Sequence, residues 1–190
     1  PMLNRAIQSR YPPGSTLKML MALAGLQEGV ITKHSTIYSQ GFFQIGRRTA
    51  GCHAPAGNYD VEKSIRMSSN VYYYKLALKL GHENIIKYAK MFGFGSRTGI
   101  DIPGEKSGII PTSEWLKKHR NSGKPTKGMI INYGIGQGEF TATPIQIAAY
   151  TAAIANECTY FQPHIVKEIF NNITYKKEKL LETNLKFFEK

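Results

Sequence analysis

Apolar residues recur at helical spacing just after the first break in the chain. Pro12, Pro13 and Gly14 interrupt regular structure. An apolar face begins directly after them and ends near Gly29. Its members are Leu17, Leu20, Met21, Leu23, Ala24 and Leu26. The pattern predicts a helix over about residues 15–28, with one face buried.

The rest of the chain alternates between helical patterns and segments rich in turn residues. Residues 30–59 lack helical periodicity, which predicts strands and loops. A helix is expected to follow Asp60, a suitable N-cap, and the polar triplet Ser68-Ser69-Asn70 interrupts it. Further helices are predicted over residues 71–80, 83–92, 113–119 and about 144–156, with loops over 96–112 and 121–128.

The last long helix and the tail complete the expected elements. Pro144 suits the first turn of that helix. Its predicted buried stripe consists of Ile145, Ile147, Ala148, Ala152 and Ile154. After Tyr160, alternating apolar and polar residues predict a strand or a hairpin.

Ser15 and Lys18 place a hydroxyl and an amine one turn apart at the start of the first predicted helix. Residues three apart are neighbours on a helix, so the Lys18 amine can reach the Ser15 oxygen and, when neutral, take its proton. Burial and the helix dipole both disfavour the ammonium form. The pattern S-x-x-K also arises by chance about once in such a chain, so the pair alone does not establish a serine acylation centre.

The composition is that of a globular chain with excess positive charge. The 190 residues are 42% hydrophobic, which suffices for one domain with a sizeable core, and no apolar run is long enough to span a membrane. The net charge of +12 favours anionic partners such as phosphorylated lipids, polyanionic cell-wall material or nucleic acid. No RNA-binding pattern of basic and aromatic residues is found, so we expect no nucleic-acid partner. The first residues do not resemble a signal peptide, and we expect them to be internal to a longer gene product.

Few residues suit a metal or a disulfide. Cys52 and Cys158 do not form a disulfide framework, and their separation leaves open whether they pair. Cys52, His53 and His164 have the chemistry of zinc ligands without the spacing, so we expect no metal.

Further motifs accompany Ser15 and Lys18 in a fixed order. Ser68-Ser69-Asn70 matches S-x-N, and the segment from Phe92 to Gly108 contains F-G-F-G and T-G-I-D-I-P-G-E-K-S-G. The segment from Gly134 to Gln146 contains G-I-G-Q-G and T-A-T-P-I-Q. Its glycines lack the lysine of a phosphate-binding loop, which favours close backbone packing. Together these motifs resemble those of class B penicillin-binding proteins, over residues 1 to about 170. The D-I-P-G-E-K-S-G string and the three tyrosines after Asn70 are most similar to elongation-type members.

This resemblance implies an α/β (α+β) transpeptidase fold, shared with serine β-lactamases, in which helices flank an antiparallel sheet. Residues 1–190 would be part of a transpeptidase domain that cross-links peptidoglycan stem peptides through a serine acyl-enzyme. Ser15 would attack the penultimate D-alanyl carbonyl, and Lys18 would remove its proton. Ser68 would pass a proton to the leaving D-alanine, and Asn70 would orient Lys18 and bind the substrate amide. No cofactor is implied.

The resemblance also implies partners and a location. The partners would be the stem peptide of the lipid-linked precursor, β-lactams, and membrane proteins of the elongation complex, including a lipid-linked glycosyltransferase and a scaffold protein. The location would be the periplasmic side of the bacterial inner membrane, with an anchor outside these residues. A net charge of +12 fits that setting.

The chain departs from the family pattern in some respects. The motif K-[ST]-G is not found, since neither Arg97-Thr98-Gly99 nor Lys124-Pro125-Thr126 fits it, and the strands that precede the nucleophile helix in the family are also missing. We therefore expect these residues alone to be catalytically incomplete, with a sheet that lacks strands from both ends. Ser69 stands where some zinc-binding relatives have Cys, and Asn58 lies near the position of their His.

Two alternatives share the acylation step. A serine β-lactamase must also position a water for deacylation, and the D-I-P-G-E and G-Q-G segments argue against it. A non-catalytic sensor or scaffold would be acylated stably by a β-lactam without cross-linking any peptide.

Overall fold

The chain divides into two compact units in a computed structural model that describes residues 2–171, 173–174, 176–178 and 184–186. The first unit comprises residues 12–90 and 109–141, and the second comprises residues 1–11, 91–108 and 142–190. Ser15, Lys18, Ser68 and Asn70 all belong to the first unit. Among the described residues, no helix combines the length and the hydropathy needed to cross a membrane.

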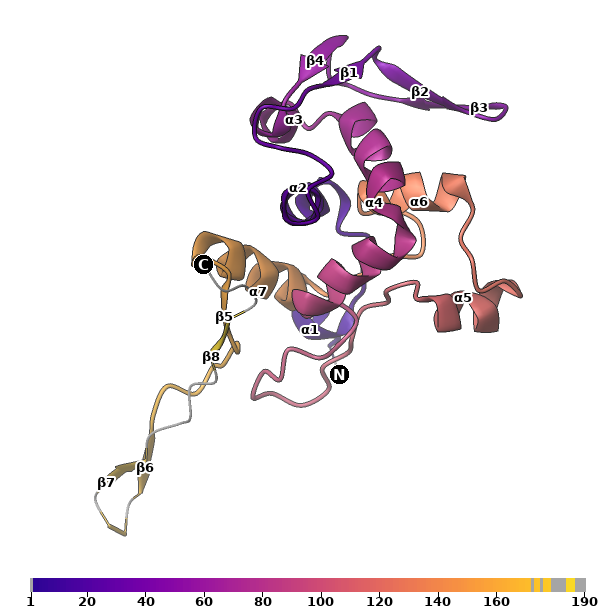
Figure 1. Cartoon of the computed structure of the whole chain (residues 1–190). Coiled ribbons are helices and arrows are strands. Elements are labelled where there is room, and N and C mark those ends of the chain that lie inside the picture. Colours follow the sequence, from indigo (N-terminus) through magenta and orange to yellow (C-terminus); the bar gives the residue numbers. More distant parts are fainter. Residues whose placement is uncertain (1, 172, 175, 179–183, 187–190) are drawn as a thin grey trace. The chain divides into compact units, whose positions relative to one another are not determined.

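The first unit contains a set of helices and two pairs of short strands (Figure 1). Its elements are the 3-10 helix η1 (Gly14–Leu17), α2 (Lys18–Gln27), β1 (Ile37–Ser39), β2 (Phe42–Ile45), β3 (Arg48–Gly51), β4 (Gly57–Tyr59), α3 (Val61–Arg66), α4 (Asn70–Met91, whose last residue belongs to the second unit), α5 (Ser113–Arg120) and α6 (Lys127–Gly134). Strand β1 pairs with β4 and β2 with β3, both antiparallel. The strands and loops predicted over residues 30–59 are therefore confirmed.

Helix α2 buries the face that its apolar pattern predicts. Leu17, Leu20, Met21 and Ala24 are fully buried, whereas Leu26 at the C-terminal end of the pattern is 39% exposed. The predicted helix is confirmed, but its first turn is the tighter helix η1.

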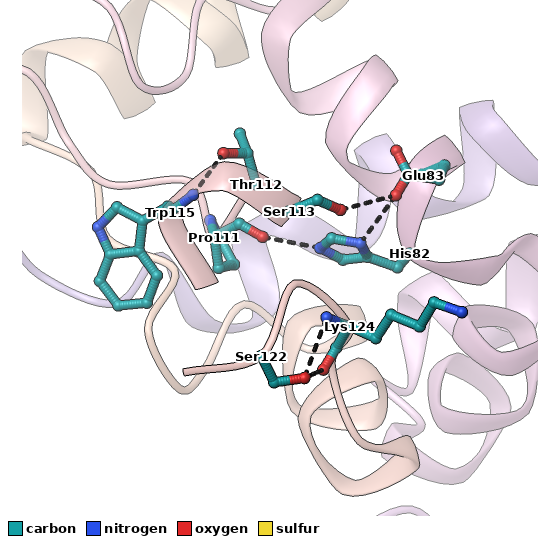
Figure 2. Close-up of polar contacts among 8 residues, drawn as sticks. All are labelled: His82, Glu83, Pro111, Thr112, Ser113, Trp115, Ser122 and Lys124. Carbon is teal, nitrogen blue, oxygen red and sulfur yellow. Dashed lines mark hydrogen bonds and ion pairs between the residues drawn. The ribbon is translucent and has the colours of Figure 1, made fainter. Parts of the chain in front are cut away.

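Helix α4 bends at Gly81, where the sequence predicts that a helix ends (Figure 1). Gly81 has a φ of +75°, which glycine adopts without strain. Just after this bend, Figure 2 shows His82 and Glu83 bound to the segment that leads into α5. The His82 Nε2 donates to the Pro111 carbonyl at 2.7 Å, and the Ser113 hydroxyl donates to the Glu83 carboxylate at 3.0 Å. These bonds fix the path of the chain into α5.

Helix α6 was not predicted, and its first residues fall in the expected loop over 121–128. Its signal is Thr126, whose hydroxyl accepts from the Met129 N–H at 3.2 Å as an N-cap. The helix is short and contains Gly128, so neither its length nor its propensity distinguishes it from a loop.

The second unit contains two helices and two further strand pairs. Its elements are α1 (Arg5–Gln8), α7 (Pro144–Ala155), β5 (Thr159–Phe161), β6 (Ile169–Asn171), β7 (Lys176–Glu178) and β8 (Asn184–Lys186). Strand β5 pairs with β8 and β6 with β7, so all four strand pairs of the described residues are antiparallel. The β6–β7 pair confirms the hairpin predicted after Tyr160.

The stripe predicted for α7 is wrong, although the helix and its N-terminus are confirmed. The buried residues are Gln146, Ala149, Tyr150 and Ala153, and the predicted Ala148 and Ala152 are exposed. The reason is that α7 is apolar nearly all round, so periodicity does not select a face. The buried amide of Gln146 selects it instead. Its oxygen accepts from the backbone of Thr143 and Gly108 at 2.9 and 3.1 Å.

Candidate active site

Ser15 lies in the 3-10 helix η1, and Lys18 is the first residue of α2. A 3-10 helix has three residues per turn, so side chains three apart leave its axis in the same direction. Ser15 is exposed, whereas Lys18 is only 2% exposed. The local fold thus presents a hydroxyl to solvent and keeps the amine beside it buried.

Two glycines hold the loop that carries Ser15. The Gly14 N–H donates to the Gly136 carbonyl at 2.9 Å, and both residues have a positive φ. A Cβ on Gly136 would overlap the backbone of Gly14. The predicted close backbone packing of the G-I-G-Q-G segment is therefore confirmed, and it supports the residue that precedes Ser15.

The triplet Ser68-Ser69-Asn70 forms the connection between α3 and α4. Ser68 adopts a left-handed φ of +50°, which is costly for a residue with a Cβ and recurs at functional sites. The Ser69 hydroxyl accepts from the Tyr72 N–H at 3.4 Å, and Asn70 begins α4. This turn directs the carbonyl and hydroxyl of Ser68 and the amide of Asn70 towards Lys18.

Lys18 uses all three of its N–H donors in this turn. Its Nζ donates to the Ser68 carbonyl at 2.8 Å, to the Ser68 Oγ at 2.8 Å and to the Asn70 Oδ1 at 2.7 Å. The Ser68 Oγ in turn donates to the Ser15 Oγ at 3.1 Å. Lys18 makes no direct hydrogen bond to Ser15 among the described residues, so Ser68 lies between the amine and the exposed hydroxyl. The structure thus brings together the four residues that the motifs single out.

The burial of Lys18 changes its proton affinity. Loss of solvation lowers its pKa from 10.5 to about 8, and the charge of the Cys52 thiolate opposes this shift. With a pKa of about 8, about one amine in ten is neutral at pH 7, against about one in three thousand for an unshifted lysine. No carboxylate forms an ion pair with Lys18 in the described part of the chain. The amine is therefore suited to accept a proton near neutral pH.

Comparison with known proteins identifies the family. Residues 1–187 match the penicillin binding protein transpeptidase domain. The chain belongs to this family. It is 38% identical over 171 residues to the peptidoglycan D,D-transpeptidase MrdA of Acinetobacter baumannii, an alignment that covers 88% of this chain and 25% of that protein.

Solved structures of the family share the fold. Penicillin-binding protein 2 (PBP2) of Helicobacter pylori, in complex with MreC, superposes with a TM-score of 0.81 at 38% identity, over 86% of this chain and 31% of that one. A chain of a peptidoglycan synthase complex superposes with a TM-score of 0.83 at 30% identity, over 98% of this chain and 31% of that one. The expected fold class is confirmed. The chain spans about a quarter of the length of the curated relatives it matches.

Cys52 and Tyr73 also lie at this candidate site, although the motifs do not predict them there. The Cys52 thiol lies 3.8 Å from the Ser69 hydroxyl. Burial disfavours the Cys52 thiolate, but hydrogen bonds from the backbone of Val71, Ala54 and Asn70 and from Ser69 outweigh it and lower the pKa. The Lys18 Nζ lies 5.6 Å from the centroid of the Tyr73 ring. Tyr73 follows Asn70 by three residues on α4, and this spacing is the signal that would have found it.

The segment around D-I-P-G-E has a structural role in the second unit. The Glu105 carboxylate, only 6% exposed, accepts from the Thr98 N–H at 2.6 Å, the Thr98 hydroxyl at 2.7 Å and the Gly99 N–H at 3.0 Å. This confirms that Arg97-Thr98-Gly99 is part of a loop and not the K-[ST]-G motif.

The residues considered as metal ligands do not gather. Among the described residues, no three His, Cys, Asp or Glu side chains form a cluster suited to a metal ion, and Cys52 and Cys158 are both free thiols. The absence of a metal in the working protein stays a prediction.

A separate hollow of about 820 Å³ lies in the first unit, lined in part by His82, Glu83, Lys117 and Lys124. None of the four motif residues lines it. Figure 2 shows that several of its polar groups bind one another, including the Ser122 hydroxyl, which donates to the Lys124 carbonyl at 3.1 Å.

Proposed function

We propose that this chain carries the acylation centre of a peptidoglycan D,D-transpeptidase of the elongation type, as part of a transpeptidase domain. The observation that supports the proposal most directly is the hydrogen-bonded path from the buried Lys18 amine through the Ser68 hydroxyl to the exposed Ser15 hydroxyl. The shared sequence motifs and the fold of the family point to the same chemistry.

In the first step, the Ser15 oxygen attacks the penultimate D-alanyl carbonyl of a stem peptide. Once Lys18 is neutral, a lone pair replaces one of its three N–H donors, so the Ser68 hydroxyl can donate to Lys18 and accept from Ser15. The Ser15 proton then moves to Ser68 and the Ser68 proton to the Lys18 amine, so that the base acts through one hydroxyl. The carbon–nitrogen bond to the terminal D-alanine then breaks. The leaving nitrogen takes a proton back from Lys18 along the same path, and Ser15 is left as an ester.

In the second step, an amine of a neighbouring stem peptide attacks the ester carbonyl. The new amide bond is the cross-link, and the proton that the amine loses returns through Ser68 to the Ser15 oxygen as the ester bond breaks. Asn70 keeps Lys18 directed at Ser68 through its Oδ1, and its NH₂ group would donate to the substrate. β-Lactams would acylate Ser15 by the same first step.

The partners and the location belong to this proposal too. The solved relatives include PBP2 bound to MreC and a peptidoglycan synthase complex that joins polymerization to crosslinking. A scaffold protein and a membrane-bound glycosyltransferase are therefore the proposed partners, with the lipid-linked precursor as the source of stem peptides. The proposed location is the periplasmic face of the inner membrane.

Covalent labelling by fluorescent penicillin tests the assignment in the full polypeptide that carries this sequence. We expect Ser15→Ala to abolish labelling and Lys18→Ala to slow it by about 100-fold or more. Thr16→Ala is the matched control, since it removes the neighbouring hydroxyl, and it should retain the label. Undiminished labelling of Ser15→Ala would falsify the assignment.

The lifetime of the acyl-enzyme separates the transpeptidase from its alternatives. A transpeptidase should hold the penicilloyl group for minutes or longer and should cross-link stem peptides in a reconstituted assay. Rapid turnover of a chromogenic β-lactam would instead identify a β-lactamase. A stable label without any cross-linked product would identify a sensor or scaffold.

A further inference from the structure

The Lys18 amine lies over the face of the Tyr73 ring, 5.6 Å from its centroid. A cation within about 6 Å of an aromatic face is attracted by the ring quadrupole, and the attraction grows when the pair is shielded from water. Tyr73 is 0% exposed and Lys18 is 2% exposed. The contact therefore lies in the range where this attraction is strong.

The other groups around the Lys18 amine offer its ammonium form no carboxylate among the described residues, so the contact with the ring contributes more to its stability. Ser68 and Asn70 supply neutral oxygens, and the described residues supply no carboxylate partner. Cys52, the residue directly after β3, is the titratable group whose charge acts on Lys18. The ring of Tyr73 thus joins these neutral oxygens in stabilising the ammonium, and like them it does not titrate near neutral pH. Burial raises the pKa of Tyr73 well above its ordinary value.

The ring is anchored through its hydroxyl. The Ser64 Oγ donates its one proton to the Val61 carbonyl at 2.7 Å, so it must accept from the Tyr73 hydroxyl, which lies 3.1 Å away. Ser64 is also 0% exposed. A directed chain of hydrogen bonds therefore ties the ring to the backbone of α3.

Two further contacts limit movement of Tyr73. The ring of Tyr72 meets it edge to face, with centroids 5.2 Å apart. Gly134 at the end of α6 lies against the Tyr73 carbonyl, which a Cβ there would approach to 2.8 Å. Tyr73 on α4 is thus held by α3 at its hydroxyl and lies against α6 at its backbone carbonyl.

We propose that Tyr73 is a positioning residue for Lys18: its anchored ring face holds the amine against Ser68 and determines how readily the amine carries a proton. The inference deepens the proposed function, on which it rests. It predicts two separable effects. Weakening the ring quadrupole changes the pH dependence of acylation, and removing the ring also lowers the rate at high pH, because the amine is then less well placed.

The decisive variants replace Tyr73 without changing its shape. Tyr73→Phe keeps the ring face, and a ring-trifluorinated phenylalanine at the same position keeps the shape but weakens the quadrupole. Both rings lack the hydroxyl that anchors Tyr73, so they are compared with each other. We expect the pH of half-maximal penicillin labelling to be lower by about 0.5–1 unit with the fluorinated ring than with Tyr73→Phe, at the same plateau rate. The direction follows because less stabilisation of the ammonium lowers the Lys18 pKa. Tyr73→Leu should show the lower midpoint and a reduced plateau.

Cys52 also titrates, so each profile is repeated in the Cys52→Ser background, where the same difference between the two rings is expected. Equal midpoints for phenylalanine and its fluorinated analogue would overturn the proposal. So would a folded Tyr73→Leu protein with the wild-type profile.

A direct titration keeps this inference separate from the proposed function. The chemical shift of carbon-labelled Lys18 reports its pKa in Ser15→Ala protein, in which no acylation occurs. We expect the fluorinated ring to lower that pKa by the same amount as the labelling midpoint. If wild-type protein fails to label with penicillin, the proposed function fails while this titration still decides the role of Tyr73. If labelling depends on Ser15 but the titration shows no difference, the role of Tyr73 fails alone.

Discussion

A methyl group on Gly136 tests whether the G-I-G-Q-G segment holds the nucleophile in place. Gly136 has a φ of +66°, where an L-residue costs about 1–2 kcal/mol. The added Cβ would also lie 2.7 Å from the Gly14 nitrogen and 3.1 Å from its carbonyl carbon. These are backbone atoms held by the Gly14–Gly136 hydrogen bond of 2.9 Å, so they cannot rotate away as a side chain would.

Strain and overlap together should lower the free energy of unfolding of Gly136→Ala by about 2–5 kcal/mol. The overlap pushes on Gly14, and the next residue is Ser15. A displacement of the attacking oxygen by about 1 Å lowers a rate by about 100-fold. We therefore expect penicillin labelling to slow by one to two orders of magnitude in protein that is still folded.

Gly138→Ala is the matched control. Gly138 also has a positive φ, +80°, but the nearest atom to its added Cβ is a side-chain carbon of Tyr133 at 3.4 Å. This variant should therefore show only the backbone strain, about 1–2 kcal/mol, and label at the wild-type rate. Urea unfolding and the labelling time course measure the two quantities. If Gly136→Ala labels as fast as Gly138→Ala, the segment does not position Ser15.

Three further predictions follow from other contacts. First, the rate of penicillin labelling should rise with pH, with a midpoint near 8, as Lys18 loses its proton. Cys52→Ser should move this midpoint to lower pH, because it removes the thiolate charge that raises the Lys18 pKa. Cys158→Ser is the control and should leave the midpoint unchanged. Second, Ser68→Ala should slow labelling at every pH by about 100-fold, since the path from Lys18 to Ser15 passes through its hydroxyl; a wild-type rate would show that Lys18 acts directly. Third, Glu105→Ala should lower the free energy of unfolding, measured by urea unfolding, by about 2–3 kcal/mol, because it leaves three donors of Thr98 and Gly99 without an acceptor. Glu105→Gln should lower this free energy by less, since it keeps one acceptor oxygen.

The helices of the first unit were largely predictable, because short-range rules determine them. The apolar face after Gly14, the N-cap Asp60 and the break at Gly81 each act over a few residues, and each is found where expected. The buried face of α7 was not predictable, since a helix that is apolar nearly all round has no preferred side. The contacts of Gln146 with distant backbone groups decide it.

The motifs likewise indicated the four residues at the site but not how they connect. Spacing along one helix suggested that Lys18 contacts Ser15 directly, whereas the left-handed turn at Ser68 places its hydroxyl between them. Hydrophobic periodicity does not predict such a turn, because a residue with a Cβ adopts a positive φ only where its surroundings hold it there.

Two glycines of the G-I-G-Q-G segment contact the residues that support the nucleophile Ser15 and the base Lys18. Gly136 lies against the backbone of Gly14, next to the nucleophile, and Gly134 lies against the backbone of Tyr73, whose ring supports the base. One short segment therefore contacts the supports of both Ser15 and Lys18. A side chain at either glycine would displace the Ser15 hydroxyl or the Lys18 amine relative to the other. Both groups must stay within hydrogen-bond distance of the Ser68 hydroxyl, which explains why two residues without side chains are needed here.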